Sequence, residues 1–139
     1  MSRVLLDTSI IVAVLRDRTR ENAERLLAEI GDQEIVLTRI VSAELLCGAK
    51  SDAEWGILQK YTRSKALLDE NAELWNDAAR LYFDARRAGK TIRKLTDCCI
   101  AHLAIANNVT LIHNDRDFEA IATVRSLKEV RLDMAKVKK

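Results

Sequence analysis

The sequence predicts an α/β fold, a three-layer α/β/α sandwich built around a mostly parallel sheet of four or five strands. Short apolar runs alternate along the chain with longer amphipathic segments, which is the pattern of strands joined by helices. The 139 residues contain no repeat, linker or low-complexity segment, so we expect one domain spanning residues 1–139. Because helices cover the strands in such units, both faces of the sheet are expected to be buried.

The first half of the chain contains three of the expected strands. Residues 3–6 form a compact apolar run, and Thr8 or Ser9 is expected to cap the helix that follows at residues 10–15. Apolar side chains recur at helical spacing over residues 20–30, which predicts a second helix. The other expected elements of this half are a strand at 35–38, helices at 41–49 and 52–62, and a short edge strand at 66–68.

The second half begins with a long periodic segment, residues 71–88, which predicts a helix that Gly89 ends. Another helix is expected at residues 97–107. The last expected elements are a buried strand at 109–112, a helical turn at 118–122 and a final strand at 130–132. In parallel α/β sheets, ligands bind beyond the carboxyl ends of the strands, so functional residues are sought there.

Composition narrows the class of protein only in part. The formal net charge of +2 argues neither for nor against a nucleic-acid partner. No apolar run approaches the roughly 20 residues of a membrane-spanning helix, so no membrane association is expected. Asp7 interrupts the apolar N-terminal segment, which argues against a signal peptide, and we expect a cytoplasmic protein.

The three cysteines do not form a metal-binding or disulfide pattern. Cys47, Cys98 and Cys99 contain no CxxC pair, and the two histidines do not stand at ligand spacing from any cysteine pair. All three lie among apolar residues. We therefore expect reduced, buried thiols.

Three acidic residues stand among apolar neighbours, unlike most of the 21 acidic residues in the chain. Asp7 follows the first expected strand, Glu44 lies on an apolar face of its helix, and Asp97 opens a helix rich in isoleucine and alanine. A buried carboxylate without a partner is costly, and three that converge repel one another. A divalent cation such as Mg²⁺ resolves both problems, because it takes hard oxygen ligands, and it suits phosphodiester hydrolysis.

A fourth acid follows a later strand. Asp115 lies three residues beyond the strand expected at 109–112, from where its side chain can reach the same edge of the sheet. Asp117 lies close behind it, as either a further ligand or the N-cap of the helical turn that follows.

Each of these acids also has a purely structural alternative. Asp7 and Asp97 could cap helices, and Glu44 could pair with Arg39. The four acids fall at the predicted strand ends of one parallel sheet, however, and a shared site explains this placement better than separate structural roles do.

Four short motifs occur at characteristic places: DTS at 7–9 after the first strand, IVSAEL at 40–45, TDCCIA at 96–101 and NDRDF at 114–118 after a late strand. In this order and spacing they resemble the PIN-domain family, and within it the VapC-type toxins of bacterial and archaeal toxin–antitoxin pairs. The stretch ARRAGKTIR at 85–93 strengthens the resemblance, which extends from Leu5 to about Ala122.

The resemblance implies a three-layer α/β/α fold and Mg²⁺-dependent endoribonuclease activity, with Mn²⁺ as a substitute, on tRNA, ribosomal RNA or mRNA. It also implies homodimers and inhibition by a cognate VapB-type antitoxin, whose C-terminal segment occupies the groove near the acids. Carried over by position, the catalytic and metal-binding quartet consists of Asp7, Glu44, Asp97 and Asp115.

The resemblance also suggests residues that support this quartet. Ser9 matches a small polar residue that often supports the metal site, and Asp117 matches a frequent additional acid. Many members have Thr or Ser where this chain has His113. A hard, oxygen-ligated site does not call for nitrogen, so we expect His113 to support the site rather than bind the metal. The alternatives are phosphate binding by the protonated ring and packing under Phe118.

Basic residues crowd the stretch before Asp97, where Arg86, Arg87 and Arg93 are candidates for contact with RNA. The alternative is that these cations complement the dipole of a helix C-terminus and face solvent.

The expected reaction is attack by a metal-activated water, because no residue has the surroundings of a dedicated nucleophile. The resemblance implies 5′-phosphate and 3′-hydroxyl products. A haloacid-dehalogenase-type phosphatase needs a second acid where Ser9 stands, and a response-regulator receiver needs paired acids at the first strand, so neither fits. The remaining alternative is a catalytically silent PIN-fold module that acts by binding a protein, against which the intact acidic set argues.

Overall fold

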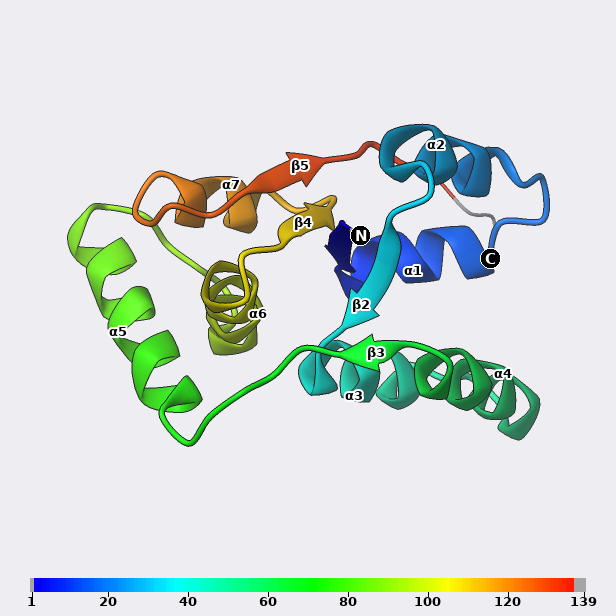
Figure 1. Cartoon of the computed structure of the whole chain (residues 1–139), viewed down its shortest axis with the longest axis horizontal. Helices are drawn as coiled ribbons and strands as arrows, with labels where there is room; N and C mark the ends of the chain where they lie inside the picture. Colours follow the sequence, from blue (N-terminus) through cyan, green and yellow to red (C-terminus); the bar gives the residue numbers. More distant parts are fainter. Residues whose placement is uncertain (1, 137–139) are drawn as a thin grey trace.

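Five parallel strands form the centre of the molecule in the order β3-β2-β1-β4-β5 (Figure 1). The computed structural model describes residues 2–136. The strands are β1 (Arg3–Leu6), β2 (Glu34–Leu37), β3 (Ala66–Leu67), β4 (Thr110–His113) and β5 (Glu129–Arg131). The predicted α/β class and its mainly parallel sheet are thereby confirmed, with every strand pair parallel.

Helices cover both faces of this sheet. They are α1 (Thr8–Leu15), α2 (Glu21–Ile30), α3 (Arg39–Cys47), α4 (Asp52–Arg63), α5 (Leu74–Arg87), α6 (Leu95–Ala106) and α7 (Arg116–Ala122). Helices α5, α6 and α7 lie on one side of the strands, and α1 and α2 lie on the other (Figure 1). Among residues 2–136, no helix is both long enough and apolar enough to cross a membrane.

The strands read as continuous apolar runs because the sheet is buried from both sides. Leu5 in β1 lies opposite Val36 in β2 and Leu111 in β4, and all three side chains are fully buried. Burying one such side chain stabilises the fold by about 1.5–3 kcal/mol. This central packing fixes the positions at which the strands end.

The strand order creates a switch point between β1 and β4. From β1 the chain continues to β2 and β3 on one side, whereas β4 and β5 lie on the other side. The backbone N–H of Asp7 donates to the carbonyl of Ile112 over 3.0 Å, which holds the residue after β1 beside the end of β4. Ligands of open α/β sheets bind at such a point, outside the carboxyl ends of the strands.

Two helix caps differ from those predicted. Asp7, rather than Thr8 or Ser9, caps α1, because its carboxylate accepts the backbone N–H of Ser9 over 3.2 Å. The structural alternative given for Asp7 is thereby confirmed, and it does not prevent the free carboxylate oxygen from facing the cleft at the carboxyl edge of the sheet. Thr38, expected as the last residue of a strand, instead caps α3 through the N–H of Val41. An extended backbone suits both a strand residue and an N-cap, and the sequence does not separate these two roles.

Other boundaries shift by one to three residues. Helix α6 begins at Leu95, so Asp97 lies in its first turn instead of heading it. Helix α5 begins at Leu74 and ends at Arg87. Gly89 follows with a φ of 80°, a left-handed conformation that favours glycine, and the predicted end of this helix is confirmed.

One of the predictions for the cysteines is wrong. Cys98 and Cys99 are buried free thiols, but Cys47 is exposed. Cys47 is the last residue of α3 and lies two positions beyond the buried Leu45, which places it on nearly the opposite side of that helix.

Candidate metal centre

The four predicted acids line one cleft of about 500 Å³ at the carboxyl edge of the sheet. Asp7 follows β1 directly, and Asp115 follows β4 by two residues. Glu44 lies in the second turn of α3, and Asp97 lies in the first turn of α6. The residues around the cleft are Asp7, Thr8, Ser9, Glu44, Cys47, Gly48, Lys94, Asp97 and Asp115.

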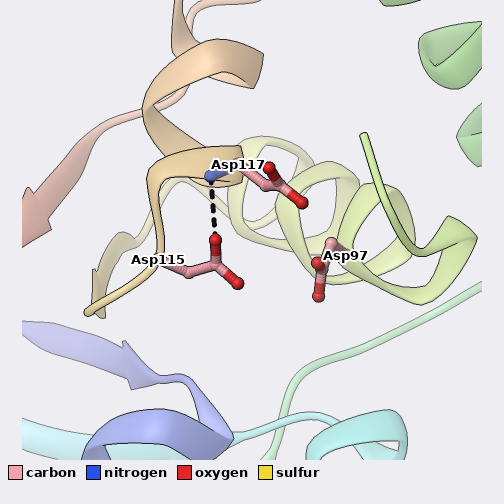
Figure 2. Close-up of side chains that lie close together, drawn as sticks. All are labelled: Asp97, Asp115 and Asp117. Carbon is pink, nitrogen blue, oxygen red and sulfur yellow. Dashed lines mark hydrogen bonds between the residues drawn. The ribbon is translucent and has the colours of Figure 1, made fainter. Parts of the chain in front are cut away.

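Three of the acids beside the cleft offer carboxylate oxygens that all lie within 4.8 Å of one another: Asp97, Asp115 and Asp117. Figure 2 shows Asp97 on its helix facing the loop that carries Asp115, with Asp117 at the start of α7. Such close carboxylates repel one another unless a cation lies between them.

Asp97 is the least compensated of these acids. Its residue is 2% exposed, and its Oδ2 atom has no hydrogen-bond partner among the described residues. Burial raises the pKa of Asp97 from 3.8 to about 7; the charge of Lys94 lowers it, and the charges of Asp7, Asp115 and Glu44 raise it further. A buried oxygen without a donor, facing other acids, is the arrangement that a hard divalent cation would satisfy.

Ser9 connects Asp7 to the neighbouring strand end. The Ser9 hydroxyl donates to Asp7 Oδ2 over 2.6 Å and accepts the backbone N–H of Asn114 over 3.2 Å. The hydroxyl therefore orients the Asp7 carboxylate and ties the loop after β4 to α1.

Glu44 is held by two residues that the sequence analysis did not assign to it. The Thr8 hydroxyl donates to Glu44 Oε1 over 3.0 Å, and Lys94 Nζ lies 3.5 Å from Oε2. Among the ion pairs of residues 2–136, Glu44 pairs with Lys94 and not with the predicted alternative partner, Arg39. The sequence predicts Thr8 only as a possible helix cap, although its place in the DTS motif next to Asp7 is a signal that it lies near the site.

Asp115 and Asp117 are joined by Arg93. Its guanidinium contacts Asp115 Oδ1 at 2.8 Å and Asp117 Oδ2 at 3.0 Å, and its backbone N–H also donates to Asp117. Asp115 caps α7 by accepting the N–H of Asp117 over 2.9 Å, the bond drawn in Figure 2. The cap of α7 is thus Asp115, and the alternative that Asp117 caps this helix is wrong.

His113 lies beneath Asp115 and is fully buried. Its Nδ1 accepts the backbone N–H of Asp115 over 3.1 Å, so the ring proton is on Nε2, which donates to Glu129 over 2.7 Å. The ring also packs against Phe118, with 5.0 Å between centroids. The ring does not line the cleft, and these contacts favour support of the Asp115 loop over phosphate binding.

We expect His113→Leu to lower the free energy of unfolding by about 2 kcal/mol, because the Asp115 N–H and Glu129 lose their partner. Urea denaturation measures this change. Glu129→Gln, which can still hydrogen-bond the ring, serves as the milder control. A loss below about 0.5 kcal/mol for His113→Leu would contradict the supporting role.

The three arginines proposed for RNA contact lie in different places. Arg93 is at the cleft edge with 59% of its side chain exposed. Arg86 and Arg87 lie in the last turn of α5, where their guanidinium groups stack over Tyr82 and Phe83 at 5.8 and 5.6 Å. Arg93 is the arginine of this set that the fold brings to the acids, because its guanidinium pairs with Asp115 and Asp117.

Comparison with known proteins places these features in a family. The family model of the PIN domain matches residues 4–124. VapC ribonuclease Mb1587 of Mycobacterium bovis is 33% identical over 129 residues, which cover 90% of this chain and 96% of that protein. Ribonuclease VapC51 of Mycobacterium tuberculosis is 29% identical over 122 residues, covering 88% of this chain and 87% of that protein.

Solved structures agree with the fold. VapBC-1 from nontypeable Haemophilus influenzae matches with a TM-score of 0.71 and 24% identity, over 93% of this chain and 97% of that one. DNA-bound VapBC from Salmonella typhimurium matches with a TM-score of 0.71 and 19% identity, over 94% and 98% of the two chains. With the matched family model and the relative above 30% identity, this chain belongs to the PIN-domain family, in the branch of the VapC-type ribonucleases.

Proposed function

We propose that this chain is the toxin endoribonuclease of a VapBC-type toxin–antitoxin pair and hydrolyses RNA phosphodiester bonds with Mg²⁺. The observation that carries the proposal is the buried, unpartnered Oδ2 of Asp97 beside a cleft that three further acids line. The relatives that match over most of the chain are named ribonucleases, which supports RNA as the substrate. The RNA classes that we expect are tRNA, ribosomal RNA and mRNA.

The metal ligands in this proposal are Asp7, Glu44, Asp97 and Asp115. Their oxygens suit Mg²⁺, with Mn²⁺ as a substitute, because both are hard cations that accept carboxylates and water. When bound, such a cation supplies Lewis acidity toward a phosphate oxygen and a water molecule. Asp117 is the weaker candidate for a ligand, since it is not among the residues that line the cleft, whereas Asp115 is. One oxygen of each of these two acids already accepts two donors.

The chain's own residues would orient the acids and the RNA. The hydroxyls of Ser9 and Thr8 fix the carboxylates of Asp7 and Glu44, so these oxygens need little rearrangement when a ligand binds. The exposed guanidinium of Arg93 lies at the cleft edge, where it can contact a phosphate of the RNA backbone. Water remains the nucleophile in this account.

The proposed partners are a cognate VapB-type antitoxin and a second copy of this chain. Structures of similar fold include VapBC complexes, some of them bound to DNA. We place the protein in the cytoplasm, where the proposed RNA substrates are found.

Mapping of RNA ends after brief expression tests this function. We expect wild-type protein to generate new 5′-phosphate ends at defined positions in cellular RNA within minutes, whereas Asp97→Asn generates none. Equal end patterns in the two cultures, or no new ends with the wild type, would overturn the proposal. The second of these results is the one that a catalytically silent binding module predicts.

A further inference from the structure

Lys94 brings a positive charge into the acidic cleft. It is the N-cap residue of α6, and its Nζ lies 3.5 Å from Glu44 Oε2 and 4.0 Å from Asp97 Oδ1. These two carboxylates come from different helices, α3 and α6. The ammonium group therefore bridges two elements whose acids would otherwise repel each other.

Lys94 is the one basic residue among the nine that line the cleft. Arg93 lies at the outer edge, where its guanidinium is engaged by Asp115 and Asp117. The Lys94 side chain is 58% exposed, so its flexible stem leaves the ammonium group free to withdraw into solvent. The Lys94 ammonium group therefore contacts Glu44 and Asp97, two of the carboxylates that a bound divalent cation would use.

We infer that Lys94 is a built-in counter-ion, which neutralises Glu44 and Asp97 in the metal-free protein and competes there with the divalent cation. The inference rests on the proposed function, because that function supplies the competing metal. Two opposite effects follow from removing the ammonium charge. The metal-free protein loses an attraction and becomes less stable, whereas the divalent cation loses a competitor and binds more tightly.

A counter-ion role for Lys94 is distinct from a role in holding RNA. A lysine that contacted only the phosphate backbone would leave both the metal-free stability and the metal affinity unchanged when removed. A lysine that supported the metal-bound geometry would weaken metal binding when removed. The direction of the change in metal affinity therefore separates the three roles.

The test uses Lys94→Met, which retains an apolar side chain of similar length but no charge, and Lys94→Gln as a second variant. Lys90→Met is the matched control, because Lys90 is exposed and forms no ion pair among the described residues. Thermal unfolding in a chelator measures the metal-free stability. Calorimetric titration of each full-length protein with Mn²⁺ measures the affinity, without any cleavage reaction.

We expect both Lys94 variants to melt several degrees below the wild type in chelator and to bind Mn²⁺ about tenfold more tightly, with Lys90→Met unchanged in both. Mn²⁺ affinity that stays equal or falls in both Lys94 variants would overturn the inference while leaving the proposed function intact. A wild type that fails to bind Mn²⁺ would overturn the proposed function and this inference with it.

Discussion

Asp97→Asn is expected to stabilise the metal-free protein at about pH 8 by roughly 2–4 kcal/mol, while it abolishes tight binding of a divalent cation. Asp97 is buried, its Oδ2 has no partner among the described residues, and its pKa is raised to about 7. An amide of the same shape removes the charge and can donate to the neighbouring carboxylates. Few substitutions at a buried polar site stabilise a fold, so the sign alone is informative.

The same substitution should change how stability depends on pH. The pKa of the Asp97 carboxyl group is about 7 in the folded chain and 3.8 when it is unperturbed. At a pH between these two pKa values, the folded chain binds more protons at this group than the unfolded chain does. The free energy of unfolding of the wild type in chelator should therefore fall as the pH rises through that range. Asp97→Asn removes this part of the decrease.

Urea denaturation in chelator at about pH 5 and about pH 8 measures both effects. Asp69→Asn is the matched control, since Asp69 is exposed and its side chain makes no hydrogen bond among the described residues. If Asp97→Asn were less stable than the wild type at about pH 8, the charge of Asp97 would not destabilise the metal-free fold, and this prediction would be wrong.

Asp7→Asn is expected to reduce the rate of RNA cleavage at least about a thousandfold with little loss of stability. Asp7 caps α1 and lies at the switch point between β1 and β4. Asparagine is as good an N-cap as aspartate, so the helix should keep its start. The substitution removes only the negative charge of Asp7, which the proposed metal site requires.

Initial cleavage rates on a purified RNA, together with the melting temperature, measure this separation of activity from stability. Ser9→Ala provides a graded comparison, because it removes the hydroxyl that orients Asp7 but leaves the carboxylate in place. We expect about a tenfold loss of rate for that variant. An Asp7→Asn protein that kept more than about a tenth of the wild-type rate would exclude Asp7 as an essential ligand.

The predictable part of the site was the part fixed by strand ends and local polarity. Asp7 follows a buried strand, and Glu44 and Asp97 interrupt apolar helix faces, so the apolar pattern of the sequence indicated these three. Asp115 rested more on the family resemblance, because Asp117 also follows the same strand closely. Parallel pairing then brings the carboxyl ends together, which is why the acids line one cleft.

The contacts that the sequence did not predict depend on how the chain turns between elements. Arg86, Arg87 and Arg93 belong to one basic stretch, but helix α5 ends at Arg87 and the left-handed conformation of Gly89 separates its last turn from Arg93. The charge pattern could not indicate which of these cations would meet the acids. The pairing of Arg93 with Asp117, 24 residues away, likewise depends on the packing of α6 and α7.

The N-cap of α1 could not be predicted from the sequence, because several neighbouring residues are suitable caps. Aspartate, serine and threonine are all good caps, and the DTS motif offers the three in succession. The structure selects Asp7 because β1 ends at Leu6, so the side chain of the next residue meets the first free N–H groups of α1.

Restoration of cleavage by added metal tests directly whether the four acids hold a catalytic divalent cation. Purified wild-type protein is freed of metal with a chelator, returned to buffer, and supplied with increasing Mg²⁺ in the presence of a purified RNA. We expect no cleavage before addition, saturable recovery with Mg²⁺, products that carry 5′-phosphates, and no recovery for Asp7→Asn. Cleavage that persists in chelator, or that Asp7→Asn recovers equally, would show that the acids do not act through a divalent cation.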